Sequence, residues 1–357
     1  MSRRRPARAT LKDIARAVGV NVSTVSRALS PDSAHPVSGP LREKIRKASR
    51  RLNYLPNSAA SSLRTLRTRT VGVIVPDITD PAYPPIIRGI EDGLAGHGYV
   101  AILANTDGDA RRQQRIIETL RARAVDGLIL ATVARDDPTV LRLIAGMPLV
   151  TVVRASDDPR VSSVVHDEAD GIRRILNHLV SCGHRRIAAI AGPQSLSTGF
   201  RRYRAFELHR KLLGIGKSRV NAVFANAFNE TEGERCAEEL LARGQPFTAI
   251  VCANDRLAVG AIAALRRHGL ECPDDVSVTG YNDMPLADRL SPALTTVRVQ
   301  HHKGGFESAE LVVELMRGSH AEPKHIVLPV EIVIRGSTRR NVRALAEAGL
   351  LPVSQTC

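Results

Sequence analysis

The chain of 357 residues contains no tryptophan, and its aromatic content is only 3%. An aromatic side chain near a pocket is therefore an informative feature. The five cysteines are scattered, with no CxxC pair and no cysteine–histidine pair at the spacing of a zinc site. Neither a disulfide framework nor a metal site is indicated, and we expect no metal and no cofactor.

Long apolar runs are also missing. Residues 1–10 carry arginines but no apolar core of a signal peptide, and no later segment approaches the ~18 apolar residues that a membrane helix needs. We therefore expect a cytoplasmic protein with no membrane partner. The hydrophobic fraction of 43% is ordinary for a globular protein, and the length favours two or three domains.

Positive charge is concentrated at the N-terminal end. The net charge is +15, and residues 1–70 contain 16 of the 51 lysines and arginines but only 3 of the 36 acidic residues, so this segment alone carries +13. A generally arginine-rich chain would spread its charge evenly. The asymmetry indicates a polyanionic partner for this segment, and residues 1–9 are expected to form a disordered basic arm.

The basic segment has the pattern of three short helices. Thr10 and Asp13 match a capping box at the start of the first helix, and Gly19 permits the positive φ of a tight turn after it. Asn21 can cap a second helix over 22–29. With a third helix over 40–53, this arrangement predicts a helix-turn-helix head that binds double-stranded DNA. The alternative is a helical hairpin that serves protein contacts.

The second helix of such a head lies in the major groove, with its first turn toward the base edges. Val22 and Ser23 are therefore our candidates for base recognition. Thr24, Ser26 and Arg27 are candidates for contacts to bases or phosphates. Further candidate DNA contacts are Thr10, Lys12, Asn21 and Ser38.

From residue 71 onward, short apolar segments alternate with segments of helical period. This rhythm predicts right-handed βαβ units around two parallel sheets. The predicted strands are 71–76, 100–105, 127–131, 149–153, 186–192, 249–255 and 276–281, with a last extended segment at 326–338. The predicted helices include 84–97, 110–123, 167–182, 200–213, 231–243 and 256–268.

Polar residues that directly follow these strands are pocket candidates, because ligands of open parallel sheets bind beyond the carboxyl ends of the strands. These residues are Asp77, Asn105, Arg154, Gln194, Asn254, Asp255, Asn282 and Asp283.

Five stretches resemble the lactose-repressor/galactose-repressor (LacI/GalR) family of transcriptional regulators. They are TLKDIARAVGVNVSTVSRALS, LNYLPNSAASSLRT, RTVGVIVPDITDP, IIRGIEDGLAGHGY and VTGYND, in this order along the chain. The similarity runs from about residue 10 to 338. It implies a two-lobed body that resembles periplasmic binding proteins, a pseudo-palindromic operator, a homodimer and a small-molecule effector between the lobes.

The resemblance also implies a hinge helix within 56–65 that folds on operator DNA. Leu63 matches the leucine that parts a central base step, and small residues favour close approach to the minor groove. The hinge candidates for DNA contact are Asn57, Ala60, Ser61 and Leu63. Ser61 departs from the family, in which arginine or glutamine is common at this position.

For the effector, the resemblance implies Arg202 as the arginine that binds it. Asn254 matches a second ligand residue, and Tyr83 and Phe228 match aromatic ligand residues, with core packing as the alternative. Asn282 stands where the family usually has aspartate, and Val153 replaces another frequent aspartate. The loss of two carboxylates favours an acidic effector, such as a sugar acid or a sugar phosphate, over a neutral sugar.

An enzyme would need a catalytic constellation, and the chain has no GxSxG, P-loop or HExxH motif. His301 and His302 lack further metal ligands, and we interpret them as a solvated pair. We therefore expect no enzyme activity. Two alternatives stay open: a DNA-binding protein that needs no effector, and a sugar-binding protein without a DNA role.

We predict an α/β protein with an all-α head, and a transcriptional regulator with repression as the expected mode. The predicted parts are an arm (1–9), a DNA-binding domain (10–55), a hinge and linker (56–70), an effector-binding and dimerisation domain (71–340) and a tail (341–357). Within the body, we assign 71–166 and 298–322 to an N-lobe, and 167–297 and 323–340 to a C-lobe.

Overall fold

The computed structural model describes residues 9–29, 37–54, 67–144, 146–215, 222–318 and 322–341. The chain divides into two compact units, Met1–Thr68 and Arg69–Cys357. We call them the head and the body. The predicted arm up to residue 8, most of the predicted hinge and the tail from residue 342 lie outside the described residues.

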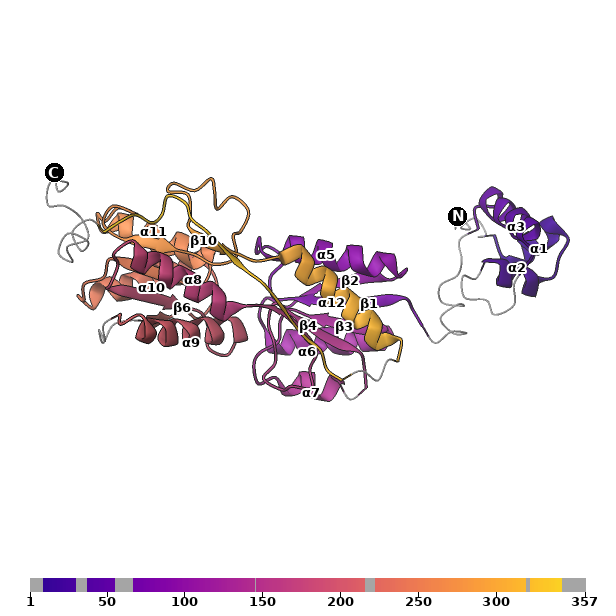
Figure 1. Ribbon diagram of the computed structural model, residues 1–357. Coiled ribbons are helices and arrows are strands. Elements are labelled where there is room, and N and C mark those ends of the chain that lie inside the picture. The colour runs from indigo at the N-terminus through magenta and orange to yellow at the C-terminus, as the bar shows by residue number, and fades with distance from the viewer. Residues whose placement is uncertain are drawn as a thin grey trace, which may run out of the picture. The chain divides into compact units, whose positions relative to one another are not determined.

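The described residues of the head form three helices around one small core, and these helices are labelled in Figure 1. They are α1 (Leu11–Val18), α2 (Val22–Leu29) and α3 (Gly39–Arg51). Gly19 ends α1 with φ of 75° and donates its N–H to the Ala15 carbonyl at 2.9 Å, which is the left-handed C-cap that glycine favours. The buried core residues of the head are Ile14, Ala15, Val18, Val25, Ala28, Ile45 and Ala48.

The first lobe of the body is built on a six-stranded parallel sheet in the order β11-β5-β4-β3-β1-β2. Its strands are β1 (Thr70–Val75), β2 (Val100–Asn105), β3 (Gly127–Leu130), β4 (Leu149–Val152), β5 (Ser163–His166) and β11 (His325–Leu328). Its helices are α5 (Tyr83–Gly96), α6 (Ala110–Ala122), α7 (Pro138–Ile144) and α12 (His301–Met316). The α5 and α12 side chains pack into one core and those of α6 and α7 into another, so both faces of the sheet are covered.

Helices α5 and α12 lie side by side although more than two hundred residues separate them (Figure 1). Glycines permit this close approach. A Cβ atom at Gly89 would lie 2.0 Å from the His302 carbonyl oxygen, and one at Gly305 would lie 2.0 Å from the Ile86 carbonyl oxygen. No larger side chain fits at either position without a shift of backbone.

The second lobe has a four-stranded parallel sheet in the order β7-β6-β8-β9. Its strands are β6 (Ile187–Ala191), β7 (Ala222–Phe224), β8 (Ala249–Cys252) and β9 (Ser277–Thr279). Its helices are α8 (Glu168–Ser181), α9 (Ser197–Leu212), α10 (Glu230–Ala242) and α11 (Asp255–Arg267). Apolar residues of α8 and α9 pack on one face of the sheet and those of α10 and α11 on the other.

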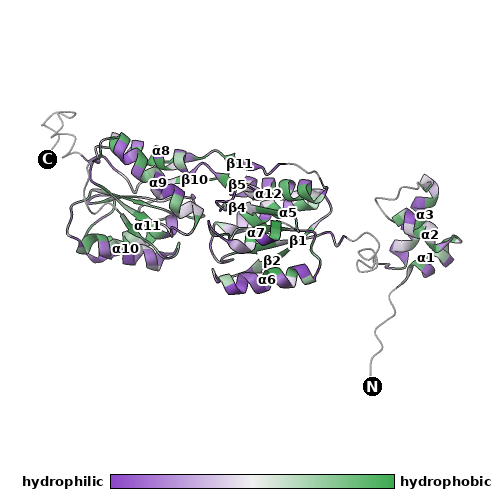
Figure 2. Cartoon of the chain, turned by 90° about the horizontal axis from the view of Figure 1, so that it is seen from below, coloured by the Kyte–Doolittle hydropathy of each residue, from purple (hydrophilic) through white to green (hydrophobic). Residues whose placement is uncertain are grey.

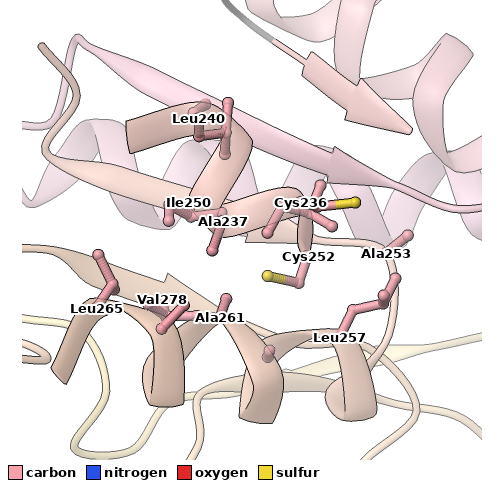
Figure 3. Packing of buried hydrophobic residues seen from close by; sticks show 14 of the residues in the cluster. Cys236, Ala237, Leu240, Ile250, Cys252, Ala253, Leu257, Ala261, Leu265 and Val278 are labelled. Atoms are coloured by element: carbon pink, nitrogen blue, oxygen red, sulfur yellow. The ribbon is translucent and has the colours of Figure 1, made fainter. Parts of the chain in front are cut away.

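The central strands β1, β3, β4, β6 and β8 are largely apolar and buried, whereas the edge strands β2 and β11 are partly exposed. The helices turn polar faces outward (Figure 2). Figure 3 shows the core between α10, α11 and the second sheet, where Cys236 and Cys252 pack among aliphatic side chains. Burial raises the pKa of the Cys236 thiol to about 11 and raises that of Cys252 well above its ordinary value. Both thiols therefore remain protonated and act as small apolar groups.

Three connections join the two lobes within the described residues: from β5 to α8, from β10 (Thr296–Arg298) to α12, and from β11 to β12 (Glu331–Val333). The last two run side by side, because β10 and β12 pair antiparallel. The third connection corrects our assignment of 323–340 to the C-lobe. Strand β11 pairs with β5 in the first sheet, so the chain returns to the second lobe only after Leu328.

Candidate functional site

The first turn of α2 is exposed on the surface of the head. Asn21, Val22 and Ser23 are exposed, whereas Val25 and Ala28 on the opposite side of the helix are buried. The buried residues attach α2 to the other two helices and leave its N-terminal turn open. A helix presented in this way can enter a groove of DNA with its first residues foremost.

Arg27 lies along α2 and points back toward this exposed turn. Its Nε donates to the Ser23 carbonyl at 3.3 Å, and its Nη2 donates to the Thr24 hydroxyl at 3.4 Å. Both bonds are long, and most of the guanidinium donors remain available. Ser26 is half-buried on the same helix.

The other described candidates of the head lie at the starts of α1 and α3. The Asp13 carboxylate accepts hydrogen bonds from the Thr10 N–H at 2.8 Å and the Thr10 hydroxyl at 2.7 Å, and these bonds lower the pKa of Asp13. The Thr10 hydroxyl proton is therefore used to hold the start of α1. Lys12 and Ser38 are exposed. The hinge candidates Asn57, Ala60, Ser61 and Leu63 lie outside the described residues.

In the body, a cavity of about 610 Å³ lies between the two lobes. Its wall includes residues that follow β1, β3 and β4 in the first lobe and β6, β7 and β8 in the second, as expected for open parallel sheets. The structure brings all five effector candidates to this cavity, and their binding of an effector stays a prediction. They are Tyr83, Arg202, Phe228, Asn254 and Asn282.

Arg202 lies on α9 and is only 5% exposed. Its Nε and Nη2 donate to the Glu168 carboxylate, the latter at 3.1 Å, and its Nη1 donates to the Ala253 carbonyl at 2.6 Å. The guanidinium carbon lies 3.7 Å from the centre of the Tyr281 ring, and Nη2 also reaches Asn282 Oδ1 at 3.4 Å. The charge of Arg202 is thus neutralised within the protein.

Glu168, the partner of Arg202, was not among the predicted site residues. It follows β5, a strand that we did not predict, and it begins α8. Acidic residues are common in the first turn of a helix, so its position in the sequence does not distinguish it from a helix-capping residue. The pairing arises only when α8 and α9 pack together.

The two asparagine candidates are held by backbone and side-chain contacts. Asn254 caps α11 by accepting the Leu257 N–H at 2.8 Å, and it is buried. Asn282 has φ of 117°, and its carbonyl accepts a hydrogen bond from His301 Nε2 at 3.2 Å. Nearby, burial raises the pKa of Asp255 to about 6.

The aromatic candidates line opposite sides of the cavity. Tyr83 begins α5 in the first lobe and is 5% exposed, and burial raises the pKa of its hydroxyl. Phe228 packs against the second-lobe core, where a Cβ atom at Gly192 would lie 2.4 Å from its ring. Each therefore combines core packing with a position in the cavity wall.

Side chains of the body already connect the lobes across the cavity. Arg256 of the second lobe is paired with Glu230 at 2.7 Å and reaches the first-lobe carboxylates of Asp80 at 3.7 Å and Asp77 at 3.9 Å. Elsewhere in the interface, the Ala155 N–H donates to the Ser197 hydroxyl at 2.9 Å, and the Arg135 N–H donates to the Ser195 carbonyl at 2.9 Å. In addition, the Arg135 guanidinium carbon lies 3.5 Å from the centre of the Phe200 ring.

The histidines at the lobe connections correct another prediction. His301 is not solvated as we expected but lies in the cavity wall beside His166, with ring centres 6.4 Å apart. Burial lowers the pKa of each imidazole to about 4. Among the described residues, His166 Nε2 and His301 Nδ1 find no hydrogen-bond partner. His302, in contrast, is exposed and pairs with Asp92 at 2.9 Å.

In the described part of the chain, no helix is long and apolar enough to cross a membrane. No group of three or more histidine, cysteine, aspartate or glutamate side chains in those residues is arranged to hold a metal ion.

Comparison with known proteins covers almost the whole chain. The family model of bacterial regulatory proteins, lacI family, matches residues 10–57, and that of the periplasmic binding protein-like domain matches residues 176–338. The chain is 31% identical over 333 residues to the HTH-type transcriptional repressor CytR of Escherichia coli strain K12, a match that covers 93% of this chain and 96% of CytR. It is 34% identical over 346 residues to the HTH-type transcriptional regulator CelR of Thermobifida fusca, a match that covers 94% of this chain and 100% of CelR.

Solved structures show the same relationship. The lac repressor dimer bound to operator and the anti-inducer ONPF has a TM-score of 0.82 at 28% identity, over 93% of this chain and 100% of that chain. The CelR–cellobiose complex has a TM-score of 0.71 at 31% identity, over 92% of this chain and 100% of that chain. The chain therefore belongs to the lacI family of bacterial regulatory proteins.

Proposed function

We propose that this protein is a repressor that binds operator DNA as a homodimer, and that a small metabolite in the cavity between its lobes controls its affinity for the operator. The observation that carries the proposal is the combination of an exposed α2 turn in the head with a cavity between the two lobes of the body that is lined by both polar and apolar side chains. A DNA-binding protein without an effector has no use for such a cavity. The proposal includes no catalysis, and it places the protein with its DNA in the cytoplasm.

On DNA, we assign base recognition to Val22 and Ser23, because they occupy the exposed first turn of α2. Arg27 extends toward the same turn and is suited to a bidentate contact with guanine or to a phosphate. Further proposed contacts are Thr24, Ser26, Lys12, Asn21, Ser38 and the hinge residues Asn57, Ala60, Ser61 and Leu63. The hydroxyl of Thr10 is bonded to Asp13, so we assign it mainly to the positioning of α1.

The dimer is proposed from the relatives. The lac repressor that matches this chain is described as a dimer bound to operator. Two identical heads read a pseudo-palindromic site because a twofold axis relates both the protein and its half-sites. Affinity for DNA will fall steeply with salt, since the head neutralises phosphates with lysine and arginine.

The effector is proposed to be a sugar or a charged sugar derivative. CelR, one of the matching regulators, was solved with cellobiose. The five predicted effector residues share one cavity in this chain, and its volume of about 610 Å³ is within the range of small-molecule sites. Arg202 and Asn282 support the wall of that cavity by their mutual contact and by the ion pair with Glu168.

The proposal is tested by selecting a binding site from a random duplex library with the full-length protein, and by measuring affinity for it by fluorescence anisotropy. Arg27→Ala is expected to weaken binding about 10- to 100-fold, the effect of one bidentate base contact. Arg160→Ala, an exposed arginine of the body, is the matched control and is expected to bind normally. A selection that enriches no sequence would contradict operator recognition, and a selected site whose affinity no metabolite changes would favour an effector-independent DNA-binding protein.

A further inference from the structure

A strained turn lies in the cavity wall at the end of β4. Val153 has φ of 68°, and the Arg154 N–H donates to the Val152 carbonyl at 2.7 Å, which closes a turn of three residues around Val153. A positive φ is unfavourable for a β-branched residue, and such strain persists mainly where function requires it. Val153 and Arg154 both line the cavity.

The guanidinium of Arg154 has no hydrogen bond or ion pair with any residue that the structure describes. The two other arginines of the wall that could meet an anion are already neutralised. Arg202 is paired with Glu168, and Arg256 is paired with Glu230 in a bidentate contact at 2.7 and 2.8 Å. Arg154 is therefore the arginine of the described cavity wall whose guanidinium has no hydrogen-bonded or ion-paired carboxylate.

No carboxylate of the described wall is hydrogen-bonded or ion-paired to the Arg154 guanidinium, and each has other partners, although the charge of Arg154 favours the ionised form of Asp80. Asp77 accepts from the Thr79 hydroxyl, and Asp107 is paired with Arg112. The carboxylate of Asp80 accepts a hydrogen bond from the Ala82 N–H at 2.9 Å. The carboxylate of Asp137 accepts one from Gln113 Nε2 at 3.0 Å.

Tyr83 supplies a second donor on the same side of the cavity. It is buried in the first lobe, its hydroxyl makes no hydrogen bond to a described residue, and the charge of Arg154 acts on it. Burial raises the pKa of Tyr83, so the hydroxyl keeps its proton at neutral pH and can donate it. A guanidinium and a phenol together suit an oxyanion, which accepts hydrogen bonds from both.

We infer that Arg154, with Tyr83, forms an oxyanion subsite in the cavity, and that the effector is a sugar that carries a carboxylate or a phosphate. The inference rests on the proposed function, since it names the class of effector for the same cavity. It moves the anion contact away from Arg202, whose charge Glu168 already balances, to a residue that the turn at Val153 places in the wall.

The test uses isothermal titration of the full-length protein with matched sugars. The neutral probes are D-glucose and D-ribose, the carboxylate probes are D-gluconate and D-glucuronate, and the phosphate probes are D-glucose 6-phosphate and D-ribose 5-phosphate. We expect one of the anionic probes to bind more tightly than its neutral counterpart. Whether a carboxylate or a phosphate probe binds decides between the two oxyanions.

Three variants then assign the contact. Arg154→Gln is expected to weaken the anionic probe about 10- to 100-fold, because it removes a charge-assisted hydrogen-bond pair. Arg154→Lys keeps the charge without the planar fork and is expected to give an intermediate loss. Arg160→Gln, which replaces an exposed arginine of the same connecting segment, is expected to bind like the wild type. Thermal unfolding of each variant checks that the fold is retained.

The outcomes separate the two proposals. Tight binding of a neutral probe with no gain from the charge, or an anionic affinity that Arg154→Gln changes less than twofold, would overturn the oxyanion subsite and leave the effector-controlled repressor intact. Binding of no probe by the wild-type protein would count against the effector cavity itself, and the subsite would fall with it.

Discussion

The ion pair of Arg202 and Glu168 permits a quantitative prediction. Both side chains are almost completely buried, at 6% and 5% exposure, and two hydrogen bonds join them. Glu168→Gln preserves the size of the side chain and one acceptor oxygen but removes its charge. The guanidinium of Arg202 would then remain buried without a counter-ion.

The expected loss of stability follows from what remains around Arg202. Removing one partner of a buried ion pair costs about 3–5 kcal/mol. The Ala253 carbonyl and the Tyr281 ring still contact the guanidinium in the variant, which favours the lower end of this range. We expect about 3 kcal/mol, which corresponds to a decrease of roughly 6–12 °C in the Tm of the body.

The measurement is thermal unfolding of the full-length protein by calorimetry, with the transition of the body compared between variants. Glu239→Gln is the matched control, since Glu239 is 41% exposed and pairs with Arg235 and Arg243 on the surface. Exposed pairs contribute at most about 1 kcal/mol, so this control should change the Tm little. Equal shifts for the two variants would refute the view that Arg202 is a neutralised, structural cation.

Two further predictions concern the fold of the body. Burial lowers the pKa of His166 and of His301 to about 4, compared with about 6.5 in the unfolded chain. Between these two pH values the folded protein binds fewer protons than the unfolded chain, so the protein loses stability as the pH falls from 6.5 to 4. Each imidazole contributes at most about 3 kcal/mol to this loss. The double variant His166→Gln, His301→Gln should therefore show a weaker dependence of its free energy of unfolding on pH, measured by denaturant unfolding. An unchanged pH dependence would contradict the role of these two histidines. Gly89→Ala should destabilise the body by about 3 kcal/mol or more in a urea titration, because its Cβ would lie 2.0 Å from the His302 carbonyl oxygen. A Cβ at Gly96 on the same helix meets nothing within 4 Å, so the control Gly96→Ala should be neutral or slightly stabilising.

The local features of the head could be predicted because they depend on residues close together in sequence. The Thr10–Asp13 contact, the left-handed Gly19 and the extents of α1 and α2 all involve spacings of a few residues. Most central strands of the body were found for a similar reason, since a buried parallel strand is a short apolar run. We expected the Asn21 side chain to cap α2, but within the described residues that side chain makes no such hydrogen bond. The backbone carbonyl of Asn21 accepts hydrogen bonds from the Thr24 and Val25 N–H groups instead.

Features that depend on distant residues were missed. Strand β5 was overlooked because only two of its four residues are aliphatic. The place of β11 in the first sheet follows from its pairing with β5, in which His325 lies opposite Ser163, 162 residues earlier in the chain. Helix α12 begins with two histidines and two glycines near its start, a composition that argues against a helix until α5 packs against it. Arg202 was placed at the cavity, but its neutralisation by Glu168 required the packing of α8 on α9.

The contacts that already connect the lobes limit what an effector can do. Because Arg256, Arg135 and Ser197 bridge the interface with partners of the protein itself, a ligand gains affinity mainly from groups left over, such as Arg154 and Tyr83. Moving an equilibrium from 1:99 to 99:1 requires about 5.5 kcal/mol of differential binding. One charge-assisted hydrogen bond supplies about 1.5–3 kcal/mol. An isolated oxyanion on Arg154 therefore cannot switch the protein, and an effective ligand must contact the second lobe as well, which a sugar bearing an acidic group can do and inorganic phosphate cannot.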